Sequence, residues 1–194
     1  SRLGGSPTIA VRETVWKGGR TATVVEGASG GAPFKFQVGE TFHDRYTLIE
    51  PLGEGAMAEV WLTHLSDKVW LPLPKGHDRK FAFKLMRPEF MAEPAIRSRS
   101  CLEGRTLAEI DHPNVVKVFE YFELRNTIGL VLEYMNKGSL GRLLERKGPM
   151  SPPDAVKFMR KSLAGLQAVH EAKLIHRDMK PDNVLLSKVH GEIQ

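Results

Sequence analysis

The sequence predicts an α+β protein, in which an antiparallel sheet with one helix is followed by the first helices of a helical module. Short runs of β-branched and aromatic residues, separated by turns, fill residues 45–134. A single helical pattern interrupts these runs at 93–110. After Gly138 the apolar spacing becomes helical and stays so to about residue 172.

Composition narrows the classes of protein that fit. The chain has 194 residues, enough to bury a sizeable core. Its net charge is +5, but the basic residues are scattered, so we expect a solvated surface and no nucleic-acid partner. One cysteine excludes a disulfide framework and a cysteine-based metal site. No apolar run approaches the length of a membrane span, and we expect a cytoplasmic protein.

Changes in amino-acid composition along the chain predict three parts. Residues 1–44 are rich in Gly, Ser, Thr and Ala, and their apolar residues are isolated, so we expect a flexible leader or linker. Residues 45–135 are expected to form the sheet-rich module and the segment that joins it to the next module. Residues 136–194 begin the helical module.

Three strands open the sheet-rich module. They are expected at 46–50, 59–63 and 81–86, with a glycine turn between the first two and Pro88 ending the third. The connection at 65–80 is long, and we expect it to form a surface excursion with a small apolar patch of its own.

The helix at 93–110 follows, with Ile96, Leu102, Leu107 and Ile110 expected on one buried face. The turn 112–114 should stop it. Two further strands are expected at 115–122 and 127–134. A short helix at 139–146 then precedes a long one that Ser151 caps. Its expected buried stripe is Val156, Met159, Leu163, Leu166 and Val169.

The stretch 176–183, His-Arg-Asp-Met-Lys-Pro-Asp-Asn, concentrates the chemistry of the chain. Asp178 can accept a hydroxyl proton, Lys180 can lie against a γ-phosphate, and Asn183 can bind Mg²⁺. This spacing suits phosphoryl transfer, which depends on positioning and charge. The alternative is a solvated charged turn after a helix.

A glycine turn, Gly53-Glu54-Gly55, lies between the first two strands. Glycines there let backbone N–H groups approach phosphates closely. Alone this signal is weak, because such hairpin turns are common. It is neither a Walker loop, since no Gly-Lys-Ser/Thr follows, nor a Rossmann fingerprint, since a strand follows.

Lys84 lies in the apolar strand 81–86, where a lysine usually faces solvent. If it is buried it requires a carboxylate, because an isolated charge in the interior is costly. Glu103, on the following helix, is the natural partner. Glu109, nearer the helix end, is the rival.

The segment 132–135, Leu-Glu-Tyr-Met, joins the two modules. Extended backbone there can offer N–H and C=O groups to an adenine edge, although by itself the segment is only a linker.

Taken together, residues from about 45 to 194 resemble the protein kinase superfamily, Ser/Thr type, and in particular bacterial Ser/Thr kinases. The motifs just described occur in the family's order, and Lys180 two positions after Asp178 matches the Ser/Thr form. The resemblance implies a kinase-like fold with an N-lobe and hinge at 45–135 and the start of a C-lobe at 136–194. It implies ATP and Mg²⁺ as cofactors and Ser/Thr-bearing proteins as substrates.

The same resemblance assigns roles to residues. Those it implies as catalytic are Asp178, Lys180, Lys84 and Glu103. Those it implies as nucleotide-binding are Leu52, Gly53, Gly55, Val60, Ala82, Lys84, Glu133, Met135 and Leu185. Asn183 would bind Mg²⁺, Leu132 would be the gatekeeper, and Arg177 would allow control by phosphorylation.

Three departures from the family pattern stand out. Ala58 replaces the third glycine, the connection at 65–80 is long, and no Asp-Phe-Gly occurs among the 194 residues. Without that aspartate as a metal ligand we expect the chain by itself to catalyse poorly. The alternatives are a non-catalytic nucleotide-binding or scaffolding module of pseudokinase type and, less favoured by Lys180 and Pro181, a small-molecule kinase.

Overall fold

The computed structural model describes residues 10–15, 21–26, 37–42, 44–55, 57–71, 73, 77–124, 127–189 and 192–193. The chain divides into two compact units. The first unit is Ser1–Arg105 with Phe119–Leu132, and the second unit is Thr106–Val118 with Glu133–Gln194.

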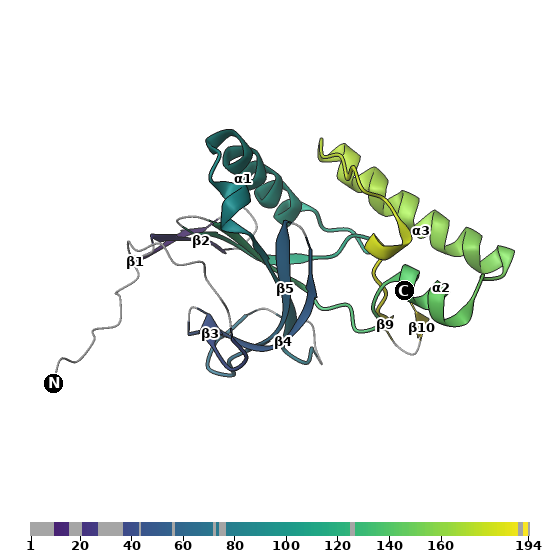
Figure 1. Cartoon of the computed structure of the whole chain (residues 1–194), viewed down its shortest axis with the longest axis horizontal. Coiled ribbons are helices and arrows are strands. Elements are labelled where there is room, and N and C mark those ends of the chain that lie inside the picture. Colours follow the sequence, from purple (N-terminus) through teal and green to yellow (C-terminus); the bar gives the residue numbers. More distant parts are fainter. Residues whose placement is uncertain are drawn as a thin grey trace. The chain divides into compact units, whose positions relative to one another are not determined.

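The described residues of the first unit build a curled sheet whose strand order is β1-β2-β7-β8-β6-β5-β4-β3 (Figure 1). The strands are β1 Ala10–Val15, β2 Thr21–Glu26, β3 Thr41–Phe42, β4 Tyr46–Glu54, β5 Ala58–Leu65, β6 Lys80–Met86, β7 Val118–Leu124 and β8 Thr127–Glu133. Strands β4, β5 and β6 pair antiparallel in sequence order, which confirms the first three expected strands.

Part of the expected leader has regular structure, because the described residues 10–15, 21–26 and 41–42 form strands. Strands β1 and β2 pair antiparallel with each other, β2 runs parallel to β7, and β3 pairs with β4. The segment of β2 is Thr-Ala-Thr-Val-Val-Glu, and its β-branched residues favour an extended backbone even where few apolar side chains are available.

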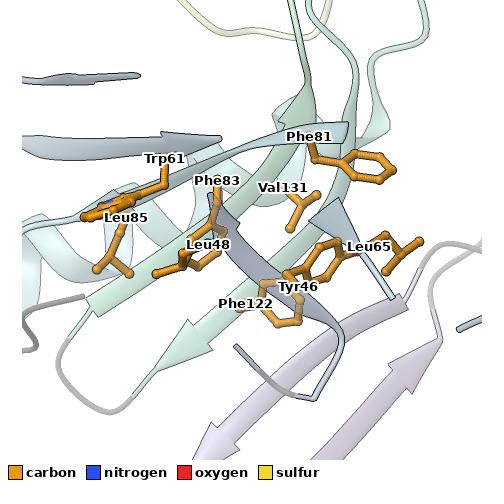
Figure 2. Close-up of a cluster of buried hydrophobic side chains, with 9 residues drawn as sticks. All are labelled: Tyr46, Leu48, Trp61, Leu65, Phe81, Phe83, Leu85, Phe122 and Val131. Carbon is orange, nitrogen blue, oxygen red and sulfur yellow. The ribbon is translucent and has the colours of Figure 1, made fainter. Parts of the chain in front are cut away.

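The core of the first unit is a cluster of buried aromatic and aliphatic side chains from strands β4 to β8 (Figure 2). Its members are Tyr46, Leu48, Trp61, Leu65, Phe81, Phe83, Leu85, Phe122 and Val131. Most of them occupy every second position of β4, β5 and β6, as expected for strands that bury one face. The β-branched and aromatic runs that predicted these three strands therefore also supply most of the core.

The connection between β5 and β6 also contributes to this core. Val69, Leu71 and Leu73 pack against it, so these residues do not form the separate apolar patch that we expected. Arg79 organises the connection, because its guanidinium donates to the carbonyls of Ser66 (2.6 Å) and Val69 (2.7 Å). Trp70 remains 83% exposed.

Helix α1, Pro94–Glu109, follows a short 3₁₀ turn η1, Pro88–Met91, and agrees with the expected helix. Its expected buried face is wrong for Ile96 and Leu102, whereas Ile110, directly after the helix, is buried as expected. Ile96 and Leu102 are exposed, whereas Gly104 is buried against Tyr121 and Leu130. Close approach at a residue without a side chain, rather than leucine spacing, fixes which side of α1 meets the sheet.

Substitution of Gly104 is expected to destabilise the protein. A Cβ at this position would lie 2.7 Å from Cε2 of Tyr121, a distance that packed atoms do not tolerate. Overpacking of this kind costs about 1–3 kcal/mol, against a gain in helix propensity of about 1 kcal/mol for Gly→Ala. We expect Gly104→Val to lower the free energy of unfolding in urea by more than Gly104→Ala. Exposed Ser98→Ala is the control, and equal stability of all three variants would contradict the packing argument.

The described part of the second unit contains α2 Leu140–Lys147, α3 Pro152–Glu171, the 3₁₀ turn η2 Pro181–Asn183, and the short strands β9 Lys188–Val189 and β10 Glu192–Ile193. Both helix starts are capped, by Ser151 as the sequence predicted and by Ser139, which we had expected to be the first residue of the short helix. The Ser139 hydroxyl accepts from the Arg142 N–H (3.2 Å), and the Ser151 hydroxyl accepts from the Asp154 N–H (3.3 Å).

The expected buried stripe of α3 is wrong for three of its residues. Val156, Met159 and Leu163 are each more than half exposed, whereas Val169 is buried. The spacing was that of a buried helix face, but among the described residues no element covers the first three turns of this face. Within the same residues, no helix is both long enough and apolar enough to cross a membrane.

Candidate nucleotide and phosphoryl-transfer site

The glycine turn lies between β4 and β5. Gly53 is in β4, Gly55 follows it, and the Gly55 N–H donates to the Ala58 carbonyl (2.8 Å). A Cβ built on Gly53 would meet no described atom within 4 Å, so the space beside this residue is open. The backbone of the turn is therefore accessible to a ligand.

Sheet register places predicted site residues in one row. Gly53 of β4 is opposite Val60 of β5, and Val60 is opposite Lys84 of β6. Opposite residues of antiparallel strands project on the same face about 5 Å apart. Leu52 is half-buried and Ala82 is buried, so apolar surface flanks the row.

Lys84 is half-buried, and burial lowers the pKa of its ammonium group below the ordinary value of 10.5. Its ammonium group forms no ion pair or hydrogen bond with any residue that the structure describes. A half-buried ammonium group without an anionic partner destabilises the folded state, and a bound anion would relieve this cost.

The expected Lys84–Glu103 ion pair is not formed between these two described residues. Glu103 instead pairs with Arg99, with 3.0 Å between Arg99 Nε and Glu103 Oε1. The two are four residues apart on α1 and therefore face one another. Glu109, the rival partner, is exposed at the end of α1.

The pKa of Lys84 makes stability depend on pH. The folded state releases the Lys84 proton at a lower pH than the unfolded chain, so stability rises with pH between that lowered pKa and 10.5. Below this window the charged ammonium destabilises the folded state. We expect Lys84→Met to raise the melting temperature at neutral pH, with a gain that shrinks toward pH 10.5. A lower melting temperature of this variant at every pH would contradict the argument.

In the second unit, the segment 178–183 folds back on itself so that three predicted catalytic side chains meet. Oδ2 of Asp178 lies 2.9 Å from Lys180 Nζ and 2.9 Å from Asn183 Nδ2. Asn183 Nδ2 also donates to the Asp178 carbonyl (2.7 Å). All three residues are exposed.

This geometry fixes the charges of the group. The hydrogen bond from Lys180, and then that from Asn183, lowers the pKa of Asp178 below its ordinary value of 3.8. The carboxylate of Asp178 in turn raises the pKa of Lys180. At neutral pH the site therefore holds an ionised acid beside a full ammonium charge.

The entry to helix α2 holds this segment in place. The Leu140 N–H donates to the Val184 carbonyl (2.8 Å), and the Leu186 N–H donates to the Gly138 carbonyl (2.8 Å). A Cβ on Gly141 would lie 2.2 Å from Oδ1 of Asp182, so α2 and η2 touch where α2 has no side chain. Leu185 pairs with Ser139 in an isolated bridge. Nothing in the sequence pattern identified Gly141 as a support for the loop.

The segment that carries Glu133 and Met135 is anchored on one side. The Glu133 N–H donates to the Lys117 carbonyl (2.8 Å), and the Met135 carbonyl accepts from Gly138 (3.4 Å). The Met135 N–H has no hydrogen-bond partner among the described residues. Leu132 ends the part of β8 that belongs to the first unit.

Mg²⁺ is a hard cation that takes oxygen ligands and retains several waters. The described residues contain no cluster of three His, Cys, Asp or Glu side chains able to hold a metal by themselves. Asn183 directs its amide nitrogen at Asp178, which leaves its carbonyl oxygen for a ligand. One amide oxygen beside one carboxylate fits a cation that is also held by phosphate oxygens.

Residues 46–194 match the family model of the protein kinase domain, and the chain belongs to that family. It is 35% identical over 144 residues to the serine/threonine-protein kinase pkn2 of Myxococcus xanthus, which covers 74% of this chain and 16% of that protein. It is 27% identical over 149 residues to the serine/threonine-protein kinase PrkC of Bacillus subtilis, covering 77% of this chain and 22% of that one. The chain thus spans less than a quarter of the length of these two relatives.

The solved kinase domain of Mycobacterium tuberculosis PknI has the same fold. It aligns with a TM-score of 0.65 at 24% sequence identity, over 82% of this chain and 60% of that domain. These comparisons confirm the kinase-like α+β fold and the kinship with bacterial Ser/Thr kinases. The division at residues 44 and 135 and the role of each site residue stay predictions.

Proposed function

We propose that this chain provides the nucleotide-binding and catalytic-loop portion of a Ser/Thr protein kinase, which transfers the γ-phosphoryl group of MgATP to a Ser or Thr hydroxyl. The observation that carries the proposal is the contact of Asp178 with Lys180 and Asn183. An acid whose carboxylate lies within 3 Å of a cation and within 3 Å of an amide suits the positioning and charge stabilisation that this transfer depends on.

Asp178 is the acceptor for the substrate hydroxyl proton. Lys180 and Asn183 both engage its Oδ2, so Oδ1 is left to orient the hydroxyl oxygen for attack on the γ-phosphorus. As the O–P bond forms, the bond from phosphorus to the β–γ bridging oxygen breaks and ADP leaves. The ammonium of Lys180 offsets the charge on the transferred group.

Lys84 and the glycine turn would hold the phosphates of ATP. The half-buried ammonium lacks an anionic partner in the described residues, so it gains more from a phosphate than an exposed lysine would. Gly53 and Gly55 present backbone N–H groups without side chains in the way. Glu103 joins this arrangement once it exchanges Arg99 for Lys84, which would orient the ammonium group.

The adenine ring would contact apolar side chains and the segment after β8. The Met135 N–H, which has no partner among the described residues, and the Glu133 carbonyl would bind the adenine edge. The apolar contacts are Leu52, Val60, Ala82 and Leu185. Mg²⁺, held by Asn183 and the phosphates, would supply charge neutralisation on the triphosphate.

Proteins that carry Ser or Thr are the proposed substrates, and the cytoplasm, where ATP is available, is the proposed location. Arg177, directly before Asp178, would pair with a phosphate on the kinase itself and so couple phosphorylation to activity.

A nucleotide-binding module without catalysis is the second candidate. It is favoured by the Arg99–Glu103 pair, which leaves Lys84 without its expected carboxylate partner among the described residues. In that case MgATP would bind but no phosphate would appear on protein.

The test is transfer of labelled phosphate from MgATP to the protein itself and to a basic protein substrate, measured on the natural full-length protein. Lys84→Met is expected to abolish incorporation, because the phosphates lose their cation. Lys80→Met, on the same strand, is the matched control and should retain incorporation. Undiminished transfer by Lys84→Met would refute the proposal, and nucleotide binding without transfer by the wild type would select the second candidate.

A further inference from the structure

We propose that Arg87 is a positioning residue for triphosphate binding, because it neutralises and anchors Glu54 inside the glycine turn. The inference rests on the proposed function and adds a residue to it. Glu54 lies between Gly53 and Gly55, and Arg87 is the first residue after β6.

Arg87 contacts the glycine turn from two sides. Its side chain, through Nη2, donates to Glu54 Oε1 in an ion pair. Its backbone N–H donates to the carbonyl of Met57 (2.9 Å). One residue, directly after β6, therefore holds the turn both before and after its second glycine.

The two side chains differ in exposure. That of Arg87 is 27% exposed and that of Glu54 is 70% exposed. A second carboxylate, Glu89, lies 3.9 Å from Arg87 Nη1, while Arg87 Nε is buried and has no hydrogen-bond partner in the described structure. The guanidinium is thus a fixed group, and Glu54 is the group that it restrains.

Charge gives this restraint a functional consequence. A carboxylate in a turn that cradles phosphates repels them, and the repulsion acts over several ångströms. Paired with Arg87, Glu54 contributes no net charge and its side chain is drawn toward the end of β6. Without Arg87 the same carboxylate would face a polyanion. The ion pair therefore makes an acidic residue compatible with a phosphate-binding turn.

The pairing predicts a rescue that a purely structural role would not produce. Arg87→Gln removes the countercharge but keeps the backbone N–H that binds Met57. We expect it to weaken MgATP binding about tenfold, the effect of losing one well-placed countercharge. Adding Glu54→Gln removes the uncovered carboxylate, so the double variant should bind MgATP within about threefold of wild type.

Isothermal titration calorimetry on the natural full-length protein measures both MgATP and adenosine. Adenosine has no phosphates, so its dissociation constant should not change in Arg87→Gln. The MgATP defect should shrink at high salt, since salt screens exposed charges. Asp111→Asn, which removes the exposed Lys117–Asp111 ion pair (3.5 Å), is the matched control and should bind both ligands normally.

Three results would overturn the inference: unchanged MgATP binding by Arg87→Gln, an equal loss of adenosine and MgATP binding, or no recovery in the double variant. If the wild type binds neither ligand, the proposed function fails and takes the inference with it. If the wild type binds both and the variants behave like it, only the role of Arg87 is wrong.

Discussion

Glu120→Ala is expected to lower the free energy of unfolding of the first unit by about 3–5 kcal/mol, the usual cost of breaking a buried ion pair on one side. The Glu120 side chain is 2% exposed. Its Oε1 accepts from Arg45 Nη2 (2.6 Å), and its Oε2 accepts from the Tyr46 hydroxyl (2.8 Å). Alanine would leave the Arg45 guanidinium and the Tyr46 hydroxyl without this acceptor.

Tyr46 shares the buried, negatively charged surroundings of Glu120. Burial, and then the negative charge of Glu120, raises the pKa of the Tyr46 phenol. The phenol therefore stays protonated at neutral pH, where it donates to Glu120. Tyr46→Phe removes one bond to a charged acceptor and should cost about 1.5–3 kcal/mol, less than Glu120→Ala.

Urea unfolding of the natural protein, followed through the transition of the first unit, measures these differences. Asp67→Ala provides the comparison, because it removes an ion pair to Arg79 whose carboxylate is 86% exposed. A surface pair of this kind contributes about 0–1 kcal/mol. If Glu120→Ala and Asp67→Ala destabilised the protein equally, the Arg45–Glu120–Tyr46 network would not be the anchor that we describe.

Asp178→Asn is expected to reduce kcat by about 10²–10⁴-fold, the range for loss of a positioned acid or base. Asparagine preserves the size of the side chain but cannot accept the hydroxyl proton. It also loses the ionic contact with Lys180. The KM for MgATP should change little, because Asp178 acts on the substrate hydroxyl rather than on the nucleotide.

The pH profile gives a second view of the same residue. Because its hydrogen bonds lower the pKa of Asp178 below 3.8, the carboxylate stays ionised as pH falls through the mildly acidic range. Any loss of kcat between pH 7 and pH 5 should therefore come from another group. Asp182→Asn, in the same loop, serves as the control and should keep kcat within about threefold of wild type. Comparable activity of Asp178→Asn and wild type would exclude Asp178 as the proton acceptor.

Short sequence patterns correctly predicted the strands and helix starts that depend mainly on neighbouring residues. Runs of β-branched and aromatic residues identified β4, β5 and β6, and Ser151 with the prolines after it identified the start of α3. Helix faces were predicted less well. The face of α1 is set by Gly104 against Tyr121, a contact between residues 17 positions apart that no leucine spacing reveals.

The same distinction applies to the site. Asp178, Lys180 and Asn183 lie within six residues, so a short motif is enough to bring them together. The Lys84–Glu103 pair depends on how α1 is turned and was not predicted correctly for this structure. The i, i+4 spacing of Arg99 and Glu103 is the sequence signal that would have predicted the competing pair. Arg87 and Glu54 are 33 residues apart, and only folding makes them neighbours.

Two tryptophans of this protein, one exposed and one buried, can serve as fluorescent probes of different environments. Trp70 stands in water at 83% exposure, whereas Trp61 is 9% exposed on β5, directly after Val60 of the row that leads to Lys84. With Trp16 and Trp70 replaced by phenylalanine, the emission of Trp61 would come from the strand beside the glycine turn. Nucleotide binding could then be followed through the intrinsic fluorescence of Trp61, without an added label.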